Sequence, residues 1–481
     1  MGYELKIFED AGFEAGYLEW LTGEQWELHQ EHFGRLWDYY QNPAVQAYLP
    51  TDDASAGRGM VQAQETGLPV RITGRRYSST REAAFGKKVS EIGRKEVVIE
   101  NDIAWRISAM VDFLFGKGVS FVSRAAEGTR RQEIEQILKA VFEANGGAVF
   151  FQDMAVLGSV YGFADCLVRP GERLTSCLCR GGRQDICSAS ETASAFCHVL
   201  DHAKTLALEL IEAPRALPIL EESDYRALRY YVQHFQQPCN AIETSGQAVG
   251  VFGRRTSARQ RKVITITEVL GANAWQRYEN DVLAAEGENA LGFVPVVHIQ
   301  NLAQPYYYEG VSDVEPLVGL QDELNTRLSD RASRITMQAF KMYLAKGLDG
   351  FSDKTVSPGR MWFTDNPEAT IEAFGGDAAT PSENMHIAEV REAMDKVSGV
   401  TPVVAGVLKN KLGNLTSGVA LKMTYMGMLT KTARKQLTYG QGLKAIVRMA
   451  LTVLDKAGVY ATSPEEREVE VVFANPLPTE E

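Results

Sequence analysis

Four cysteines and two histidines form the group of residues in this chain that comes closest to a metal-binding pattern. They are Cys177, Cys179, Cys187, Cys197, His198 and His202. If the two histidines lie on a helix, their spacing puts them on one face, and nearby thiolates could complete a tetrahedral zinc site. The CxC spacing is atypical of structural zinc sites, which use CxxC. We therefore expect reduced cysteines and no bound metal, and keep a metal-binding enzyme built on this cluster as an alternative.

Sequence motifs of nucleotide-dependent and hydrolytic enzymes are absent. The chain contains no GxxxxGK[ST], HExxH, GxSxG or GxGxxG sequence. His298 lies in the apolar run 293–299 and is interpreted as a structural histidine with satisfied hydrogen bonds. We therefore expect no catalytic residues, no cofactor and no enzymatic activity.

Length and composition indicate a globular protein with more than one structural region. The chain has 481 residues, of which 45% are hydrophobic and 23% charged, whereas one hydrophobic core organises roughly 250 to 300 residues. No run approaches the ~18 apolar residues that a membrane-spanning helix needs, and the first residues do not form a secretory signal. These features predict a soluble protein that is made in the cytoplasm.

The net charge of -12 bears on how the chain could meet nucleic acid. A protein that grips DNA with a broad basic face is disfavoured, because such binding depends on cations that neutralise phosphates. An acidic channel wall instead repels phosphates and leaves a polyanion mobile. The charge therefore favours a conduit for DNA over a tight binder.

The elements that would build such a conduit begin with a long helix. Ser312 and Glu315 form a capping box, and Asp313 adds negative charge at the positive end of the helix dipole. Apolar residues then recur at steps of three or four at Leu317, Leu320, Leu324, Leu328, Ala332, Ile335, Ala339 and Met342. A helix from Ser312 to about Lys346 would span roughly 50 Å. Residues 347–380 follow as a small turn-rich module with extended candidates at 360–364 and 370–374.

A second helix is predicted from Pro381 to Ser398. Its acidic residues are Glu383, Glu389, Glu392 and Asp395. The following segment, 399–416, has the composition of an irregular loop and carries Lys409, Asn410, Lys411 and Asn414. Loops of this length are often functional.

Another long helix is predicted from Ser417 to about Lys456, with Gly427, Gly440 and Gly442 as candidate kinks. Its apolar stripe consists of Val419, Met423, Met426, Leu429, Ala433, Leu437, Leu443, Val447, Leu451 and Leu454. It also carries the cations Lys422, Lys431, Arg434, Lys435, Lys444 and Arg448, with no acid before Asp455. We expect these cations to pair with acidic neighbours, within or between subunits, and consider direct DNA contact the weaker alternative.

The order of these segments resembles that of the portal proteins of tailed bacteriophages, and local sequences agree. Residues 310–313 followed by 320–325 are similar to the family's G-x-S-D and LQD-x-x-N motifs. Residues 417–422 resemble the S-G-x-A-L-K start of its long helix, and 292–297 with Asn301 resemble its apolar strand. Asn101 and the turn at 116–119 are similar to its N-x-x-I and G-K-x-[VI] motifs.

This resemblance implies an α+β subunit with an α/β wing, long stem helices, a small α/β clip and a long kinked helix. Its parts would be residues 1–311 as the wing, with a Cys-bearing insertion at about 171–263, and 312–346 and 381–398 as stem helices. Residues 347–380 would be the clip, 399–416 the tunnel loop, 417–458 the long kinked helix, and 459–481 a wing strand with a short C-terminal tail. A large helical crown is not expected.

The resemblance also implies a function. Twelve subunits would form a dodecamer at one capsid vertex of the virion, assembled in the host cytoplasm, beside the major capsid protein. Double-stranded DNA would pass without being read, along acidic stem residues Glu383, Glu389, Glu392 and Asp395 and weak contacts from Lys409 and Lys411. Terminase, during genome packaging, and then the head-tail adaptor would dock at the clip, where Arg360, Trp362 and Asp365 are candidates. Another capsid or tail structural protein with long helices remains an alternative.

Overall fold

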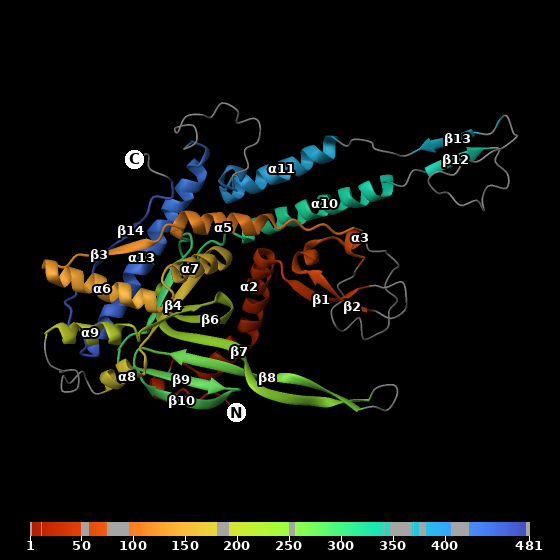
Figure 1. Ribbon diagram of the computed structural model, residues 1–481. Coiled ribbons are helices and arrows are strands. Elements are labelled where there is room, and N and C mark those ends of the chain that lie inside the picture. The colour runs from red at the N-terminus through yellow and green to blue at the C-terminus, as the bar shows by residue number, and fades with distance from the viewer. Residues whose placement is uncertain are drawn as a thin grey trace. The chain divides into compact units, whose positions relative to one another are not determined.

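The computed structural model describes residues 2–10, 12–49, 57–74, 96–179, 192–249, 255–339, 342–346, 368, 370–374, 381–405 and 423–477. The chain divides into two compact units, and most of their elements are labelled in Figure 1. The first consists of Met1–Gln41, Ile103–Pro316 and Ser398–Glu481, and the second of Asn42–Asp102 and Leu317–Val397. Helices and antiparallel sheets occur in both units, which confirms the predicted α+β class.

A five-stranded antiparallel sheet of the first unit has the order β10-β9-β8-β7-β6. Its strands are β6 (Ala216–Glu221), β7 (Asp224–Val249), β8 (Arg255–Leu270), β9 (Ala274–Glu279) and β10 (Val282–Glu288). The N-terminal residues and α1 (Ala15–Trp20) cover one face, where Phe13 and Leu18 share a core cluster with Val232 and Val269. Strands β7 and β8 continue beyond the sheet as a two-stranded ribbon (Figure 1).

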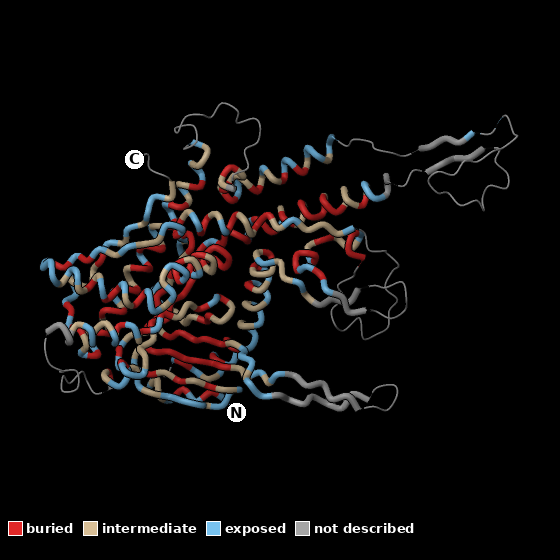
Figure 2. The backbone as a smooth tube through the Cα atoms, in the orientation of Figure 1, coloured by how far each residue is buried: buried red, intermediate tan, exposed pale blue. Residues whose placement is uncertain are grey.

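A second sheet of this unit has the order β11-β4-β5, formed by β4 (Phe163–Arg169), β5 (Ala207–Ile211) and β11 (Val296–Gln300). The central strand β4 is buried along nearly its whole length, as a strand paired on both edges and covered by helices should be. Helices α7 (Ala148–Tyr161) and α13 (Met426–Lys456) pack against this sheet, and α2 (Trp26–Gln41) packs against α7. Buried residues concentrate along these elements in Figure 2.

The first unit also contains a small antiparallel pair, β3 (Val119–Ser123) with β14 (Val469–Phe473). Helix α6 (Gly128–Ala144) packs on β3, where Phe121 and Phe142 stack with ring centroids 4.7 Å apart. Helices α5 (Asp102–Phe115), α8 (Glu172–Cys179) and α9 (Thr192–Ala203) complete the set. Strand β14 lies within residues 459–481, where a wing strand is expected.

The second unit contains a hairpin of β1 (Ala44–Leu49) and β2 (Gly57–Gln62), the short helix α3 (Val70–Thr73), and the helices α10 (Val318–Ala339) and α11 (Pro381–Ser398). It also contains a pair of strands, β12 (Met342–Lys346) with β13 (Thr370–Phe374). The bounds of α11 and β13 are those that the sequence predicts.

Polar side chains at four-residue steps on α10 bind an extended segment of the second unit. Gln321 Oε1, Asn325 Oδ1 and Ser329 Oγ accept hydrogen bonds from the backbone N–H groups of Asp102, Glu100 and Val98, at 3.1, 3.0 and 3.0 Å. A segment outside helices and sheets has no regular backbone partners, so side chains or water must satisfy its N–H groups. Two residues of the LQD-x-x-N motif, Gln321 and Asn325, therefore serve as backbone partners.

The first long helix is shorter than the sequence predicts. The cap at Ser312 is present, because its Oγ accepts from Val314 N and Glu315 N at 3.1 and 3.2 Å. A 3-10 turn at Glu315–Leu317 follows, and α10 ends at Ala339. The predicted end at Lys346 is wrong, since Met342–Lys346 pairs with Thr370–Phe374, a partner that helical periodicity cannot reveal.

The compact units divide the chain differently from the predicted parts. Residues 42–102 belong to the unit of α10 and α11, and not with the rest of 1–311. The region 171–263, expected as a Cys-bearing insertion, supplies β5 to one sheet and β6, β7 and most of β8 to the other. Among the described residues, no helix is long and apolar enough to cross a membrane.

Candidate functional site

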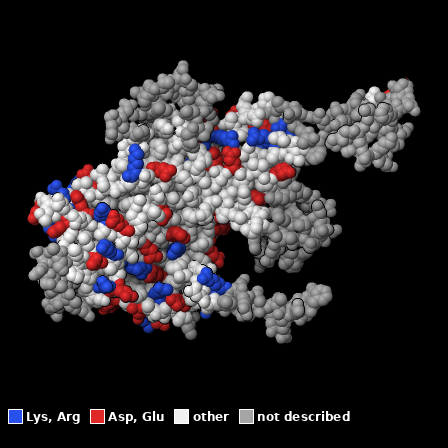
Figure 3. Space-filling view, in the orientation of Figure 1, with Lys and Arg blue, Asp and Glu red and all other residues white. Residues whose placement is uncertain are grey.

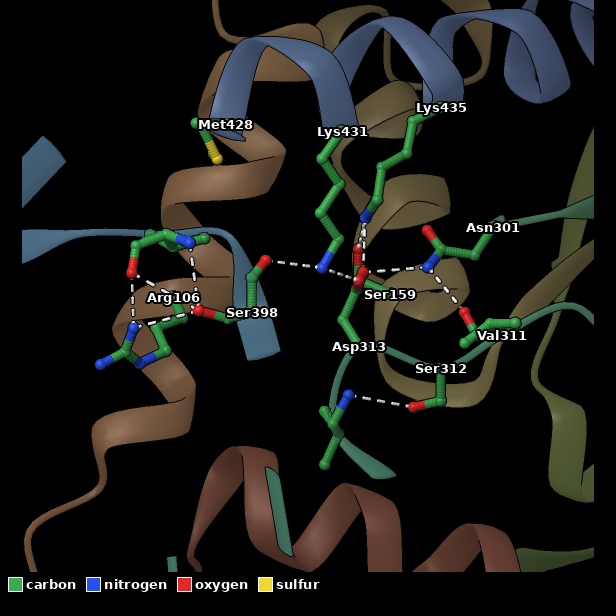
Figure 4. Close-up of polar contacts among 12 residues, drawn as sticks. Arg106, Ser159, Asn301, Val311, Ser312, Asp313, Ser398, Met428, Lys431 and Lys435 are labelled. Atoms are coloured by element: carbon green, nitrogen blue, oxygen red, sulfur yellow. Dashed lines mark hydrogen bonds and ion pairs between the residues drawn. The ribbon is translucent and has the colours of Figure 1, made fainter. Parts of the chain in front are cut away.

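A buried cluster of charges lies in the first unit where α13 meets the residues that precede α10 (Figure 4). The carboxylate of Asp313 lies between two ammonium groups, with Lys431 Nζ 2.7 Å from Oδ1 and Lys435 Nζ 2.5 Å from Oδ2. Lys435 also donates to Ser159 Oγ at 2.8 Å, and Asn301 Nδ2 donates to Asp313 Oδ2 at 2.9 Å. The cluster thus joins α7, the residue after β11, the residues that precede α10, and α13.

Burial and charge act in opposite directions on this cluster. The side chains of Asp313 and Lys435 are 1% and 2% exposed. Burial alone would raise the pKa of the Asp313 carboxyl, but Lys435 and Lys431 outweigh burial and hold that pKa well below its usual value. Burial lowers the pKa of the Lys435 ammonium, and Asp313 opposes that effect. A buried ion of either sign needs its partners, so each member depends on the others.

The residues after α11 are held by a second buried cation. Arg106 of α5 is 1% exposed, and its Nη1 donates to Ser398 Oγ at 3.1 Å and to the Val400 carbonyl at 2.6 Å. Lys431 Nζ donates to the Ser398 carbonyl at 2.8 Å, which is favourable because carbonyls at the end of a helix carry partial negative charge. Between them, Gly399 has φ +71, a conformation that favours glycine.

The start of α13 approaches the same place. A Cβ added to Gly427 would lie 3.3 Å from the Gly399 carbonyl oxygen, so the two backbones are close together. Tyr425 Oη donates to the Val403 carbonyl at 3.5 Å. The described residues on either side of 406–422, namely 398–405 and 423–428, are therefore tied to one buried framework, and the predicted tunnel loop 399–416 begins in the first of these segments. We name this framework the loop anchor: Arg106, Asp313, Ser398, Lys431 and Lys435.

The residues predicted to act at the loop and the clip lie outside the described part of the chain. These are Lys409, Asn410, Lys411 and Asn414 of the loop, and Arg360, Trp362 and Asp365 of the clip. Their roles stay predictions.

The four acidic residues predicted on α11 have different environments. Glu389 and Glu392 are 66% and 65% exposed, and Glu392 Oε1 lies 3.0 Å from Lys396 Nζ one turn away. Glu383 pairs with Arg334 of α10 and is 18% exposed, and Asp395 is half-buried. Two of the four therefore present carboxylates to solvent in this subunit.

Of the six cations that the sequence predicts to pair with acids, three have an acidic partner among the described residues, whereas Arg434 and Lys444 have no ion pair there. Lys431 and Lys435 bind Asp313, and Arg448 Nη2 lies 2.6 Å from Glu468 Oε1. Lys422 lies outside the described residues. On the face seen in Figure 3, basic and acidic side chains of the first unit are interspersed, without a broad basic face.

The predicted apolar stripe of α13 is right in its second half and wrong in its first. Leu443, Val447, Leu451 and Leu454 are buried. Met423, Met426 and Leu437 are 68%, 59% and 69% exposed, whereas the buried positions there include Met428, Thr432, Lys435 and Tyr439. In this half the buried face contains Lys435, which pairs with Asp313. Hydrophobic periodicity cannot detect a face that is buried by such an ion pair. The helix itself is continuous through all three glycines.

The cysteine and histidine group does not form a metal site in the described part of the chain. Cys177 lies on α8, and Cys197, His198 and His202 lie on α9, while Cys187 is outside the described residues. No group of three or more His, Cys, Asp or Glu residues among those described is placed to hold a metal ion.

His298 has the structural role that the sequence predicts. Its Nδ1 lies 2.7 Å from Asp165 Oδ1, and its Nε2 lies 2.6 Å from the Tyr308 carbonyl oxygen, so both ring nitrogens have partners.

Comparisons with known proteins agree with the expected family. The family model described as phage portal protein, SPP1 Gp6-like, matches residues 109–481. No curated protein sequence matches the chain significantly. The chain is similar to one in the neck of an empty GTA particle, with TM-score 0.41 and 12% identity over 78% of this chain and 80% of that one. It is also similar to a chain in the virion of a native gene transfer agent (GTA) particle, with TM-score 0.38 and 11% identity over 76% and 78%. Because the family match extends over most of the sequence and includes the loop anchor except Arg106, the chain belongs to the SPP1 Gp6-like family of phage portal proteins, the connectors between head and tail.

Proposed function

We propose that this portal protein forms a ring of twelve subunits at one capsid vertex, through which double-stranded DNA enters, is retained and leaves. The observation that carries the proposal is the family match over residues 109–481, which contains both α11 and α13. The loop anchor supports it, because a loop that acts on passing DNA needs ends that do not move with the DNA. Arg106 and the Asp313–Lys431–Lys435 cluster provide such ends.

The proposed mechanism is electrostatic and has no base readout. Exposed carboxylates of α11, such as Glu389 and Glu392, would repel phosphates and keep DNA mobile in the bore. Lys409 and Lys411 of the loop would make weak phosphate contacts. Contacts to phosphates carry no sequence information, which suits a passage that handles a whole genome.

The proposed partners follow from the same assignment. Terminase and then the head-tail adaptor would dock on residues 347–380, with Arg360, Trp362 and Asp365 as contacts, and the wing would face the major capsid protein. The assembled ring would reside in the virion after assembly in the host cytoplasm.

Electron microscopy of the purified protein, with mass by light scattering on the same sample, tests the ring. We expect particles with a central channel and a mass near twelve times 53.1 kDa. A protein that stays monomeric, both alone and when produced together with the other head proteins, would contradict the proposal.

A further inference from the structure

A groove of about 820 Å³ lies within the first unit, between α2, α7, β5 and the base of the β7–β8 ribbon. Aromatic side chains form much of its wall: Trp26, Trp37, Tyr161 and Phe235. The rings of Trp37 and Tyr161 stack with centroids 5.8 Å apart. Aromatic faces attract ammonium and guanidinium groups, so this wall is suited to a Lys or Arg side chain.

The charges of the groove favour the same kind of ligand. Three carboxylates line it, those of Asp38, Glu209 and Glu212, against one lining cation, Arg215. Glu212 is 3.7 Å from Arg215 and Glu209 is 3.4 Å from Arg169, but Asp38 has no ion pair or hydrogen bond among the described residues. Burial raises the pKa of Asp38. The groove therefore holds a half-buried carboxylate that a cation from outside could pair.

The β7–β8 ribbon has the complementary charge. Residues 253–262 read GRRTSARQRK, with five Arg or Lys residues, and no Asp or Glu occurs between Thr244 and Thr267. Strand β6 pairs with β7 only as far as Gln233, and β9 pairs with β8 only from Ile266 onward. Beyond those points the two strands pair only with each other among the described residues. An isolated two-stranded ribbon is marginally stable in water and has two unpaired edges, so it needs a partner surface.

The ribbon cannot place its outer cations in its own groove. The groove ends on β7 at Pro238, whereas Arg259 pairs with Thr244 and Arg255 with Val249. Val249 lies eleven residues beyond Pro238, which is about 35 Å along a strand. The extended backbone holds these positions away from the groove at its base. The ribbon cations could therefore reach such a groove only on another copy of the chain.

We propose that the basic ribbon of one subunit docks in the aromatic, acidic groove of the neighbouring subunit. Such a contact joins two different surfaces and repeats in one direction, which is the arrangement that closes a ring. The inference rests on the proposed ring and assigns one of its subunit contacts.

Charge reversal on each side, and on both together, tests the contact in the full chain. The ribbon variant is Arg255→Glu with Arg259→Glu, and the groove variant is Asp38→Lys with Glu212→Lys. We expect each to weaken self-association about 10-fold or more in sedimentation velocity, because like charges then face each other. The variant with all four changes, and an equimolar mixture of the two double variants, should assemble again, because opposite charges face each other.

The control is Arg124→Glu with Lys139→Glu, which changes the net charge as the ribbon variant does, at side chains 62% and 73% exposed on β3–α6. It should assemble as the wild type does, and circular dichroism should show that every variant is folded. If the wild type forms rings and the ribbon variant assembles equally well, the docking is overturned and the proposed ring still stands. The docking would also be overturned if the double variants are folded but do not assemble, and neither the variant with all four changes nor the mixture restores assembly. A wild type that forms no ring would overturn the ring and the docking together.

Discussion

Asp313 is the residue on which the loop anchor depends most. Its carboxylate forms ion pairs with two ammonium groups and accepts a hydrogen bond from Asn301, and its backbone N–H donates to the Ser159 carbonyl at 2.8 Å. One carboxylate thus satisfies two cations at a site from which water is excluded. The sequence places Asp313 at a helix start, where a solvated acid would interact favourably with the helix dipole. In the structure, Asp313 is buried.

Replacement of Asp313 by Ala should destabilise the protein by about 3 to 5 kcal/mol, because it leaves Lys435 buried without a counter-charge. Chemical unfolding measures this change. Glu143→Ala is the control, since its pair with Lys139 is exposed and worth at most about 0.5 kcal/mol. Equal unfolding free energies for the two variants would show that the cluster is not a buried ion pair.

The low pKa of Asp313 predicts an acid-dependent loss of stability. A carboxyl whose folded pKa lies below its unfolded value contributes stability that is fully present above about pH 4 and is lost as the pH falls toward the folded pKa. Asp313→Asn removes this contribution. The difference in unfolding free energy between wild type and Asp313→Asn should therefore shrink as the pH is lowered from 5 to 3. A difference independent of pH would mean that Asp313 does not titrate with folding.

At the scale of elements, α13 is the helix that joins the loop anchor to the sheet of β11, β4 and β5. Its glycines, which the sequence suggests as kinks, lie where neighbours approach closely. A Cβ on Gly442 would lie 2.4 Å from Ile299 Cγ1 of β11, and one on Gly440 would lie 3.5 Å from the Phe473 ring. Small residues at these positions let the helix approach the strands.

Gly442→Ala should destabilise the protein by about 1 to 3 kcal/mol, despite the better helix propensity of alanine, because the added methyl group meets Ile299. Combining it with Ile299→Ala should show a favourable coupling energy in a double-mutant cycle. Gly34→Ala in α2 is the control: a Cβ there meets nothing within 4 Å, so the change should be neutral or stabilise by up to about 1 kcal/mol. If the effects of Gly442→Ala and Ile299→Ala on the unfolding free energy were additive, the contact between these residues would be contradicted.

At the scale of the whole molecule, the proposed channel depends on a loop that meets DNA while its ends stay fixed. The described start of that loop and the described start of α13 are bound to the loop anchor, which is separate from the proposed phosphate contacts. Loss of the loop cations and loss of the anchor should therefore have different consequences, the first for DNA handling and the second for folding.

The double variant Lys409→Ala with Lys411→Ala should keep wild-type stability and assembly but alter the amount of DNA packaged or retained per particle, because it removes two phosphate contacts. DNA content per purified head, measured by absorbance, checks this. Lys139→Ala with Lys204→Ala is the control, since both lysines are exposed, lie outside α11 and pair with acids three or four residues away. Unchanged packaging in the loop variant would remove the loop from the mechanism.

The sequence by itself determined the α+β class, the family, the bounds of α11, the strand at 370–374, a strand within 459–481, and the pairing of three α13 cations with acids. These are local or periodic features, or ordered motifs, that need no knowledge of distant contacts. The tertiary structure decided which acid neutralises Lys435, because Asp313 is 122 residues away along the chain. It also decided that Met342–Lys346 is a strand and that Lys435, Gln321 and Asn325 face inward. Hydrophobic periodicity detects faces buried by apolar contact, whereas a polar face is buried only when partners from other elements satisfy it.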